Sequence, residues 1–259
     1  MDVIVTAGGI PIEGEPLYPL TRGLPKALLE IEGKPMVQWV LDALGGASSI
    51  GEVFLVSLGP EAGLTCTRPM HYIPDQGSML RNVRVSMARV AAAHPDATQV
   101  VVCSSDIPAM TSEMVDWRVD AIRNSVADLD YAIIDRSTME AAFPGSHRSY
   151  VHFKGLDFCS ADIHGGSLSL ATDEALWERL LAARKSALKQ AALVGLDVAF
   201  LLLTRQLTLE RAERMAEHKL GFRGKVHLSP YAEIGMDVDK PHQLDMVREY
   251  LASRKASHA

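Results

Sequence analysis

The sequence predicts an α/β fold, a three-layer α/β/α sandwich built around a mostly parallel, doubly wound sheet. Short apolar runs without polar alternation recur along the chain, and such runs are typical of strands that are buried on both faces. Amphipathic helical patterns lie between the runs, and this alternation of strand and helix places helices on both faces of one sheet. The predicted strands are residues 3–5, 53–56, 100–102 and 132–134.

The helices between these strands are indicated by apolar residues at helical spacing. They are predicted over residues 36–44, 80–90 and 115–122. The last third of the chain is different, because residues 172–220 are predicted to be a mostly helical elaboration of the same domain. Its helices are predicted over residues 175–185, 187–203 and 209–220, with Thr208 as a favourable N-cap residue for the last. A short strand over residues 225–228 follows, and Pro241 begins the final helix, where proline suits the first turn.

Composition favours a single domain that binds neither nucleic acid nor membrane. No linker rich in proline, glycine or serine divides residues 1–259, and the net charge of −6 opposes nucleic-acid binding, which favours a basic face. The longest apolar stretch, residues 191–203, contains Gly195 and Asp197 and is too short to span a bilayer, so we expect a buried helix there. Three well-separated cysteines and the lack of a recognisable signal peptide favour a cytoplasmic protein.

Residues that directly follow the predicted strands are the first candidates for a binding site, because ligands of doubly wound sheets lie beyond the carboxyl ends of the strands. Gly8 and Gly9 follow the first strand, and glycine lets backbone N–H groups approach a phosphate closely. Lys26 follows the next loop and is a candidate cationic partner for the same phosphates; a turn with a surface lysine is the alternative. The chain has no G-x-x-x-x-G-K-[ST] motif and no G-x-G-x-x-G motif after a strand, which disfavours a P-loop NTPase and an NAD-dependent reductase.

Two acidic segments are candidates for a metal site. Asp106 follows the third predicted strand and precedes Pro108, and Asp237 and Asp239 precede the final helix. Carboxylates in such places suit Mg²⁺ beside a triphosphate. Each segment alone is equally well explained as a capped turn or a helix start.

Taken together and in this order, the segments A-G-G, P-K, D-x-P and D-V-D-x-P resemble those of the nucleotidyltransferases with a glycosyltransferase-A type fold. That family includes sugar-1-phosphate and molybdenum-cofactor nucleotidyltransferases, and the resemblance extends from Asp2 to about Leu251. It implies a Mg²⁺-dependent enzyme that transfers the nucleoside-monophosphate part of an NTP to a small phosphate- or hydroxyl-bearing acceptor. Pyrophosphate would be the second product.

The resemblance also implies residue roles. Lys26, Asp106 and Asp239 would be catalytic, with Asp106 and Asp239 as the Mg²⁺ ligands. The remaining residues would bind the nucleotide or the acceptor. They are Ala7, Gly8, Gly9, Asp75, Gln76, Gly77 and Asn82 for the nucleotide and its phosphates, and His164, Gly165 and Gly166 for the acceptor.

The first loop departs from the family pattern G-x-G-x-R. Pro19 stands where the family has an arginine seven residues before the lysine, and we expect Arg22 to replace that arginine in binding the nucleotide. The loop also contains Glu13 and Glu15, which repel phosphate. Two alternatives stay open. One is a nucleotide-sugar glycosyltransferase on the same fold, although such enzymes usually carry D-x-D after the central strand. The other is a nucleotide-binding protein without catalysis, which the altered first loop suggests.

Overall fold

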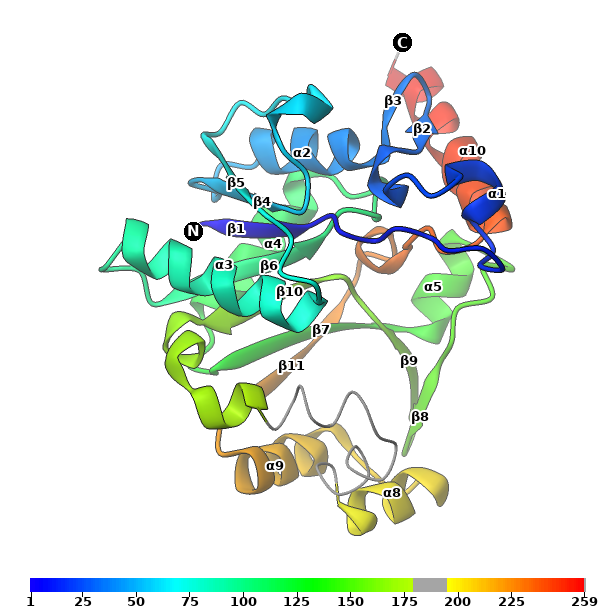
Figure 1. The fold of residues 1–259 in the computed structure, drawn as a ribbon. Coiled ribbons are helices and arrows are strands. Elements are labelled where there is room, and N and C mark those ends of the chain that lie inside the picture. The colour runs from blue at the N-terminus through cyan, green and yellow to red at the C-terminus, as the bar shows by residue number, and fades with distance from the viewer. Residues whose placement is uncertain (179–194, 259) are drawn as a thin grey trace.

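The structure is a computed structural model, which describes residues 1–178 and 195–258. A nine-stranded sheet forms the centre of the fold (Figure 1). The strand order is β5-β4-β1-β6-β10-β7-β9-β8, and β11 pairs with β7. Among the described strands of this sheet, only β9 and β10 run against the others, which confirms a mostly parallel α/β sheet. The strands are β1 (Val3–Thr6), β4 (Val53–Val56), β5 (Met70–Ile73), β6 (Gln99–Ser104), β7 (Leu129–Asp135), β8 (Val151–Phe153), β9 (Leu156–Ser160), β10 (Ile163–Ser167) and β11 (Gly224–Ser229), with β2 (Glu30–Ile31) and β3 (Lys34–Pro35) in a separate hairpin.

The helices lie on both faces of the sheet, as the three-layer prediction requires (Figure 1). Along β1, Val3 and Val5 pack into the core beneath α2, α4 and α10, whereas Ile4 packs into a second core beneath α3. Both faces of β1 are therefore buried, which explains why its sequence is apolar without alternation. The helices are α1 (Tyr18–Thr21), α2 (Met36–Gly46), α3 (Met79–Ala93), α4 (Ser112–Arg123), α5 (Arg136–Ala142), α8 (Leu196–Leu203), α9 (Leu209–Leu220) and α10 (Pro241–His258), with short 3-10 turns η1 (Lys26–Leu28), η2 (Pro60–Ala62), η3 (Leu168–Thr172) and η4 (Glu233–Gly235).

All four predicted strands and all three predicted helices between them are present, as β1, β4, β6, β7 and α2, α3, α4. The central position of β1 follows from its pairing, since Val3 is in register with Val53 on one side and with Val101 on the other. The carboxyl ends of β1, β4, β5 and β6 therefore meet at one edge of the sheet. The loops that carry the candidate site residues leave from this edge.

A buried ion pair joins this half of the sheet to the other. The side chains of Arg118 on α4 and Asp130 on β7 are almost completely buried, and Arg118 Nη1 lies 2.6 Å from Asp130 Oδ1. Arg118 Nε also donates to the carbonyl of Ile163 on β10, at 3.0 Å. Because the guanidinium satisfies groups on two strands, it holds the reversed strand β10 in place between β6 and β7.

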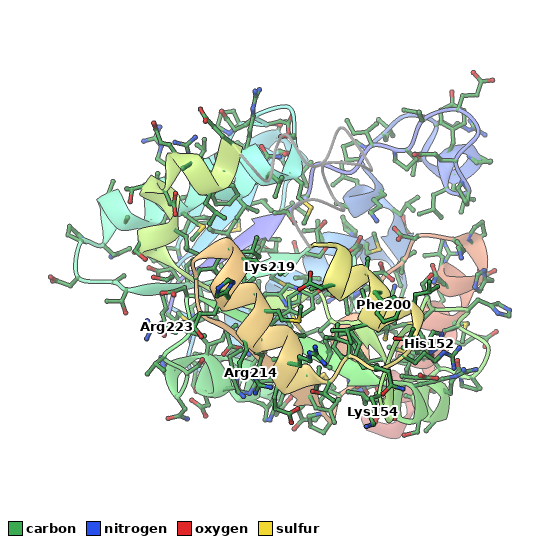
Figure 2. All side chains as sticks on the ribbon, turned by 90° about the horizontal axis from the view of Figure 1, so that it is seen from below. His152, Lys154, Phe200, Arg214, Lys219 and Arg223 are labelled. Carbon is green, nitrogen blue, oxygen red and sulfur yellow. The ribbon has the colours of Figure 1, made fainter. Side chains whose placement is uncertain are left out.

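The C-terminal elaboration lies beneath β7 and β11 (Figures 1 and 2). The helix predicted over residues 209–220 is α9, and Thr208 caps it by accepting a hydrogen bond from Arg211 N at 3.3 Å. The predicted strand over residues 225–228 is β11, and the final helix begins at Pro241. Of the helices predicted over residues 175–185 and 187–203, residues 175–178 and 196–203 are helical and Gly195 is the N-cap residue of α8, whereas residues 179–194 fall outside the described residues.

The prediction of a buried helix over residues 191–203 is wrong for the part that the structure describes. Phe200 is 64% exposed and Leu203 is 85% exposed, whereas Leu201 is buried. The physical reason is position, because α8 lies at the outer side of the elaboration and turns only one face to the protein (Figure 2). Within residues 1–178 and 195–258, no helix has the length and apolarity needed to cross a membrane.

Candidate active site

A pocket of about 400 Å³ lies beyond the carboxyl ends of β1, β4, β5 and β6. It is the expected place for a ligand of a doubly wound sheet. Seven residues predicted to bind nucleotide or metal line it, on loops that come from distant parts of the chain. The lining consists of Thr6, Gly8, Gly9, Lys26, Asp75, Gly77, Ser78, Met79, Asn82, Ser104, Ser105 and Asp106.

Close packing explains the two glycines after β1. A Cβ atom at Gly8 would lie 2.7 Å from Oγ of Ser57, and one at Gly9 would lie 3.2 Å from Cε of Lys26. Lys26 N donates to the Gly9 carbonyl at 2.8 Å, so the glycine loop and the lysine form one unit. Ala7 is buried beneath this unit and does not line the pocket.

The opposite wall is a loop held by Asn82. Asn82 Nδ2 donates to Asp75 Oδ1 at 2.8 Å, and Asn82 Oδ1 accepts from Gln76 N at 2.6 Å. Together with the N–H of Gly77 and the hydroxyl of Ser57, the Asn82 amide lowers the pKa of Asp75. The side chain of Gln76 turns back to a backbone carbonyl and is not part of the lining. This wall is therefore fixed before any ligand binds.

Ser57 was missed by the sequence reasoning, although a signal for it exists. It directly follows β4, so the strand-end rule that selects Gly8 and Asp106 also selects Ser57. It adopts a positive φ of 74°, and its hydroxyl group lies against both Gly8 and Asp75. Ser57 thus links the glycine loop to the Asn82 wall.

Lys26 joins the two acids that were predicted to share a metal. Its Nζ lies 2.5 Å from Asp106 Oδ2 and 2.5 Å from Asp239 Oδ1. Burial by itself lowers the pKa of Lys26, but the two carboxylates outweigh it, so the pKa is raised and the side chain is a permanent cation. Asp106 is nearly buried, with 8% of its side chain exposed, whereas Asp239 is more than half exposed.

A second pocket of about 450 Å³ adjoins the first through Gly9 and Lys26. Asp239 and Lys240 form one side of it, and the loop after Gly9 forms the other. Glu15, on that loop, was expected to repel phosphate. In the structure it accepts a hydrogen bond from Ile12 N at 2.9 Å and so stabilises the loop. The structure thus brings the predicted residues Gly8, Lys26, Asp106 and Asp239 to one continuous cleft.

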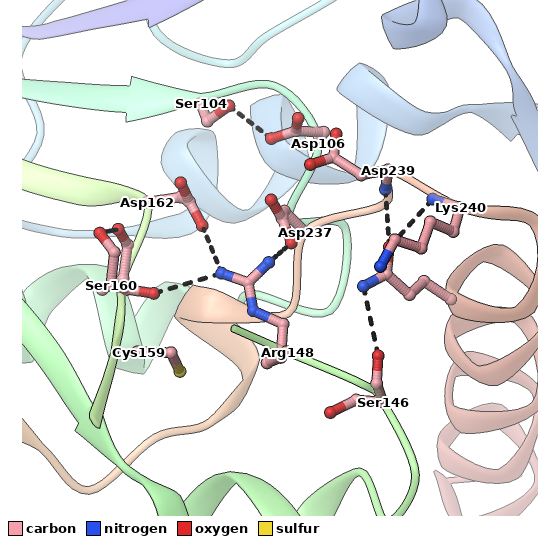
Figure 3. A network of polar contacts seen from close by, with 12 residues as sticks. Ser104, Asp106, Ser146, Arg148, Cys159, Ser160, Asp162, Asp237, Asp239 and Lys240 are labelled. Atoms are coloured by element: carbon pink, nitrogen blue, oxygen red, sulfur yellow. Dashed lines mark hydrogen bonds and ion pairs between the residues drawn. The ribbon is translucent and has the colours of Figure 1, made fainter. Parts of the chain in front are cut away.

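Arg148 is the residue on which the geometry of the final acidic motif depends (Figure 3). Its Nη1 forms an ion pair with Asp237, and its Nη2 lies 3.8 Å from Asp162 Oδ2 and donates to the Ser160 carbonyl at 3.4 Å. Asp237 is therefore committed to Arg148, which leaves Asp239 to face Lys26. Arg148 was not predicted, and no motif in its loop indicates it.

Asp162 is a further acid that the sequence reasoning did not assign. Burial, reinforced by the negative charge of Asp106, raises the pKa of Asp162 to about 7, although the cation of Arg148 opposes the shift. Asp162 directly precedes β10, and its side chain lies close to those of Asp106 and Asp237 (Figure 3). It is therefore a carboxyl group that changes charge near neutral pH.

We predict that Asp162→Asn stabilises the protein more at pH 8 than at pH 5. In the unfolded chain Asp162 loses its proton near pH 3.8, but in the folded protein it does so near pH 7. Its contribution to stability is thus full below pH 3.8 and is lost as the pH rises through 7. Since one pKa unit corresponds to about 1.4 kcal/mol, a relative gain on the order of 1 kcal/mol or more is expected.

Melting temperatures of the wild type and the variant from pH 5 to pH 8 test this prediction. Asp75→Asn is the matched control, because the pKa of Asp75 is lowered from 3.8 and its titration lies below this range. The difference between Asp75→Asn and wild type should therefore stay constant. A difference between Asp162→Asn and wild type that is equally flat would contradict the prediction.

The structure does not bring the remaining predicted residues to the cleft. His164 stacks on Tyr131 with ring centroids 4.1 Å apart, and burial lowers the pKa of His164 to about 3. Gly165 and Gly166 are buried in β10 and line neither pocket of the cleft. Arg22 is exposed at the left-handed end of α1 and lines neither pocket. Acceptor and nucleotide contacts by these residues stay predictions.

We predict that Gly165→Ala destabilises the fold by about 1–3 kcal/mol, the usual cost of overpacking a core. A Cβ atom at Gly165 would lie 2.7 Å from Cγ1 of Ile122 on α4. Gly166→Ala is the control, since its nearest neighbour would be Met87 Cε at 3.5 Å, an ordinary contact. Urea unfolding measures both. A stable Gly165→Ala with a raised KM for the acceptor would instead indicate a binding role.

The donor set of the cleft fits a small, hard cation. Among residues 1–178 and 195–258, no group of three or more His, Cys, Asp or Glu side chains is arranged to hold a metal. Two carboxylates nevertheless already hold one cationic centre, the Lys26 ammonium, between them. Mg²⁺ typically takes one or two carboxylates and completes its shell with substrate phosphates and water.

The comparison with known protein families identifies the chain. Residues 20–192 match the MobA-like NTP transferase domain. The chain belongs to this family. The expected nucleotidyltransferase activity, transfer of NMP from an NTP to a small acceptor with release of pyrophosphate, is the activity of its homologues and is confirmed at this level.

Individual relatives of this nucleotidyltransferase agree with the assignment. A hypothetical transferase from Thermus thermophilus is 32% identical, with a TM-score of 0.79 over 94% of this chain and 98% of that one. The 3-deoxy-manno-octulosonate cytidylyltransferase of Geobacter metallireducens is 28% identical over 262 residues, which cover 91% of this chain and 94% of that protein. A CMP-2-keto-3-deoxy-manno-octonic acid synthetase complexed with CTP shares the fold, with a TM-score of 0.58, 16% identity and 98% coverage of both chains.

Proposed function

We propose that this nucleotidyltransferase is a Mg²⁺-dependent cytidylyltransferase, which transfers CMP from CTP to a small sugar or sugar-like acceptor. The observation that carries the proposal is the position of Lys26, between Asp106 and Asp239 and beside Gly9, at the junction of two pockets. Cytidylyltransferase relatives support the choice of base and of acceptor class. The three cysteines form no disulfide, which supports a cytoplasmic location.

The first pocket suits the nucleotide. Its rigid wall of Asp75, Gly77 and Asn82 offers fixed polar groups to a base, and Gly8 and Gly9 leave room for phosphates close to the backbone. Fixed donors and acceptors of this kind bind without a large ordering cost. The triphosphate would then extend toward Lys26 and the second pocket.

Asp106 and Asp239 are the residues that would hold Mg²⁺. Bound there, the ion would supply Lewis-acid polarisation of the α-phosphate and neutralise charge that grows during transfer. The chain's own residues do the rest. Gly8 and Gly9 position the phosphates, and Lys26 stabilises charge on the departing pyrophosphate. An acceptor oxygen attacks the α-phosphorus in line, and no protein nucleophile is required.

The proposal is tested by the thermal stabilisation that each of the four NTPs gives in the presence of Mg²⁺. A ligand at about 100 times its dissociation constant adds roughly 2.7 kcal/mol of stability, so CTP should raise the melting temperature by several degrees. Release of pyrophosphate from CTP in the presence of 3-deoxy-manno-octulosonate or a sugar phosphate then tests turnover. A larger shift with GTP, UTP or ATP would contradict the cytidylyl specificity.

A further inference from the structure

The cation between the two candidate metal ligands, Asp106 and Asp239, is a side chain of the protein, the Lys26 ammonium. Lys26 Nζ lies 2.5 Å from a carboxylate oxygen of Asp106 and 2.5 Å from one of Asp239. Direct ligands of Mg²⁺ lie at about 2.0–2.1 Å, so the ion would need nearly the same space. The ammonium and a divalent ion cannot both occupy it.

The charges around this position strengthen the conflict. Four carboxylates, those of Asp106, Asp162, Asp237 and Asp239, lie close together (Figure 3). Arg148 neutralises Asp237 and approaches Asp162, which leaves Lys26 as the cation that balances Asp106 and Asp239. A metal ion that entered while Lys26 stayed in place would meet a positive charge at contact distance.

A bound nucleotide would offer the Lys26 ammonium a second position, next to its phosphates. The stem of Lys26 packs on Gly9, where a Cβ atom would lie 3.2 Å from Cε, and Lys26 lines both pockets of the cleft. Phosphates placed along Gly8 and Gly9 would give the ammonium a new anionic partner within reach of a rotation of its four-carbon side chain. The two carboxylates would then be free.

We propose that Lys26 keeps the metal position closed in the free protein and opens it when NTP draws the ammonium away, so that metal and nucleotide bind with positive coupling. The inference rests on the proposed metal-dependent function and deepens it. Coupling of this kind is reciprocal, so each ligand raises the affinity of the other by the same factor. Couplings between two sites commonly amount to about 5-fold to 150-fold.

Binding of Mn²⁺ alone, measured from the electron paramagnetic resonance signal of the free ion, tests the proposal without turnover. Lys26→Met removes the ammonium and keeps most of the length of the side chain. It should bind one Mn²⁺ at least about tenfold more tightly than wild type, and the further change Asp106→Asn should abolish that gain. Lys154→Met is the matched control, because it makes the same charge change on the β8–β9 turn beneath the sheet (Figure 2) and should bind like wild type.

Equal Mn²⁺ affinities of wild type and Lys26→Met would overturn the proposal, and so would no binding by either. Lys26→Gln, whose amide can still hydrogen-bond to a carboxylate, gives the same comparison if Lys26→Met folds poorly. Pyrophosphate release by the wild type is measured in parallel. Turnover without any gain of Mn²⁺ affinity in the variants refutes the coupling alone, whereas a wild type that binds no NTP refutes the proposed function.

Discussion

Replacement of Asp106 or Asp239 by Asn is expected to reduce turnover by about 10³-fold or more. Each change keeps the shape of the side chain and removes the charge that would hold Mg²⁺. A bound divalent ion stabilises the transition state by several kcal/mol, and each 1.4 kcal/mol corresponds to about tenfold in rate. Pyrophosphate release at saturating Mg²⁺ measures the effect. The double variant should be little worse than either single one, because residues that act as a unit are strongly non-additive.

Asp237→Asn is the control for this experiment, and the contacts of Asp237 predict how its effect should differ from that of Asp239→Asn. Asp237 is paired with Arg148, so its loss leaves a mostly buried cation with one weaker partner. We expect a lower melting temperature and a milder loss of turnover than for Asp239→Asn. Effects of Asp106→Asn and Asp239→Asn that multiply would mean that the two acids serve no common ion. A greater loss of turnover in Asp237→Asn than in Asp239→Asn would mean that the metal ligand is Asp237 and not Asp239.

Lys26→Ala is expected to lower kcat by about 10²-fold to 10³-fold, with a smaller change in the affinity for CTP. An interaction that strengthens as charge develops on the leaving group costs more in the transition state than in the ground state when it is removed. Steady-state kinetics over CTP concentration separate the two effects. Lys240→Ala is the control, because Lys240 lines the second pocket but holds neither acid. Near-normal turnover of Lys26→Ala would make Lys26 a structural counter-ion only.

Much of the fold could be predicted because its central strands are buried on both faces. β1, β4, β6 and β7 are apolar runs for that reason, and Thr208 marks the start of α9 through a local hydrogen bond. β10 was not predicted as a strand. It contains Gly165 and Gly166, and the need for a glycine at 165 comes from contact with Ile122 on another element, which no local pattern reports. α8 was misjudged because apolar composition alone does not fix exposure.

The site was predictable where the strand-end rule applies. Gly8 and Asp106 follow predicted parallel strands, so the topology brings them together, whereas Asp75 follows β5, which was not predicted, and was assigned from the family resemblance alone. Arg148 comes from an irregular loop, and only the folded chain places it against Asp237. The family resemblance selected Asp239 over Asp237, but the physical basis of that choice could not be read from the motif, since both lie before the same helix. It depends on which cation each acid meets.

A crystal structure of the protein with CTP and Mg²⁺ would show directly whether one cleft binds nucleotide and metal through these residues. We predict that the base lies against Gly77 and Asn82, that Mg²⁺ is bound by Asp106 and Asp239 directly or through water, and that Lys26 Nζ has left the carboxylates for the phosphates. CTP bound outside the cleft, or a metal held away from Asp106, would contradict this assignment of the site.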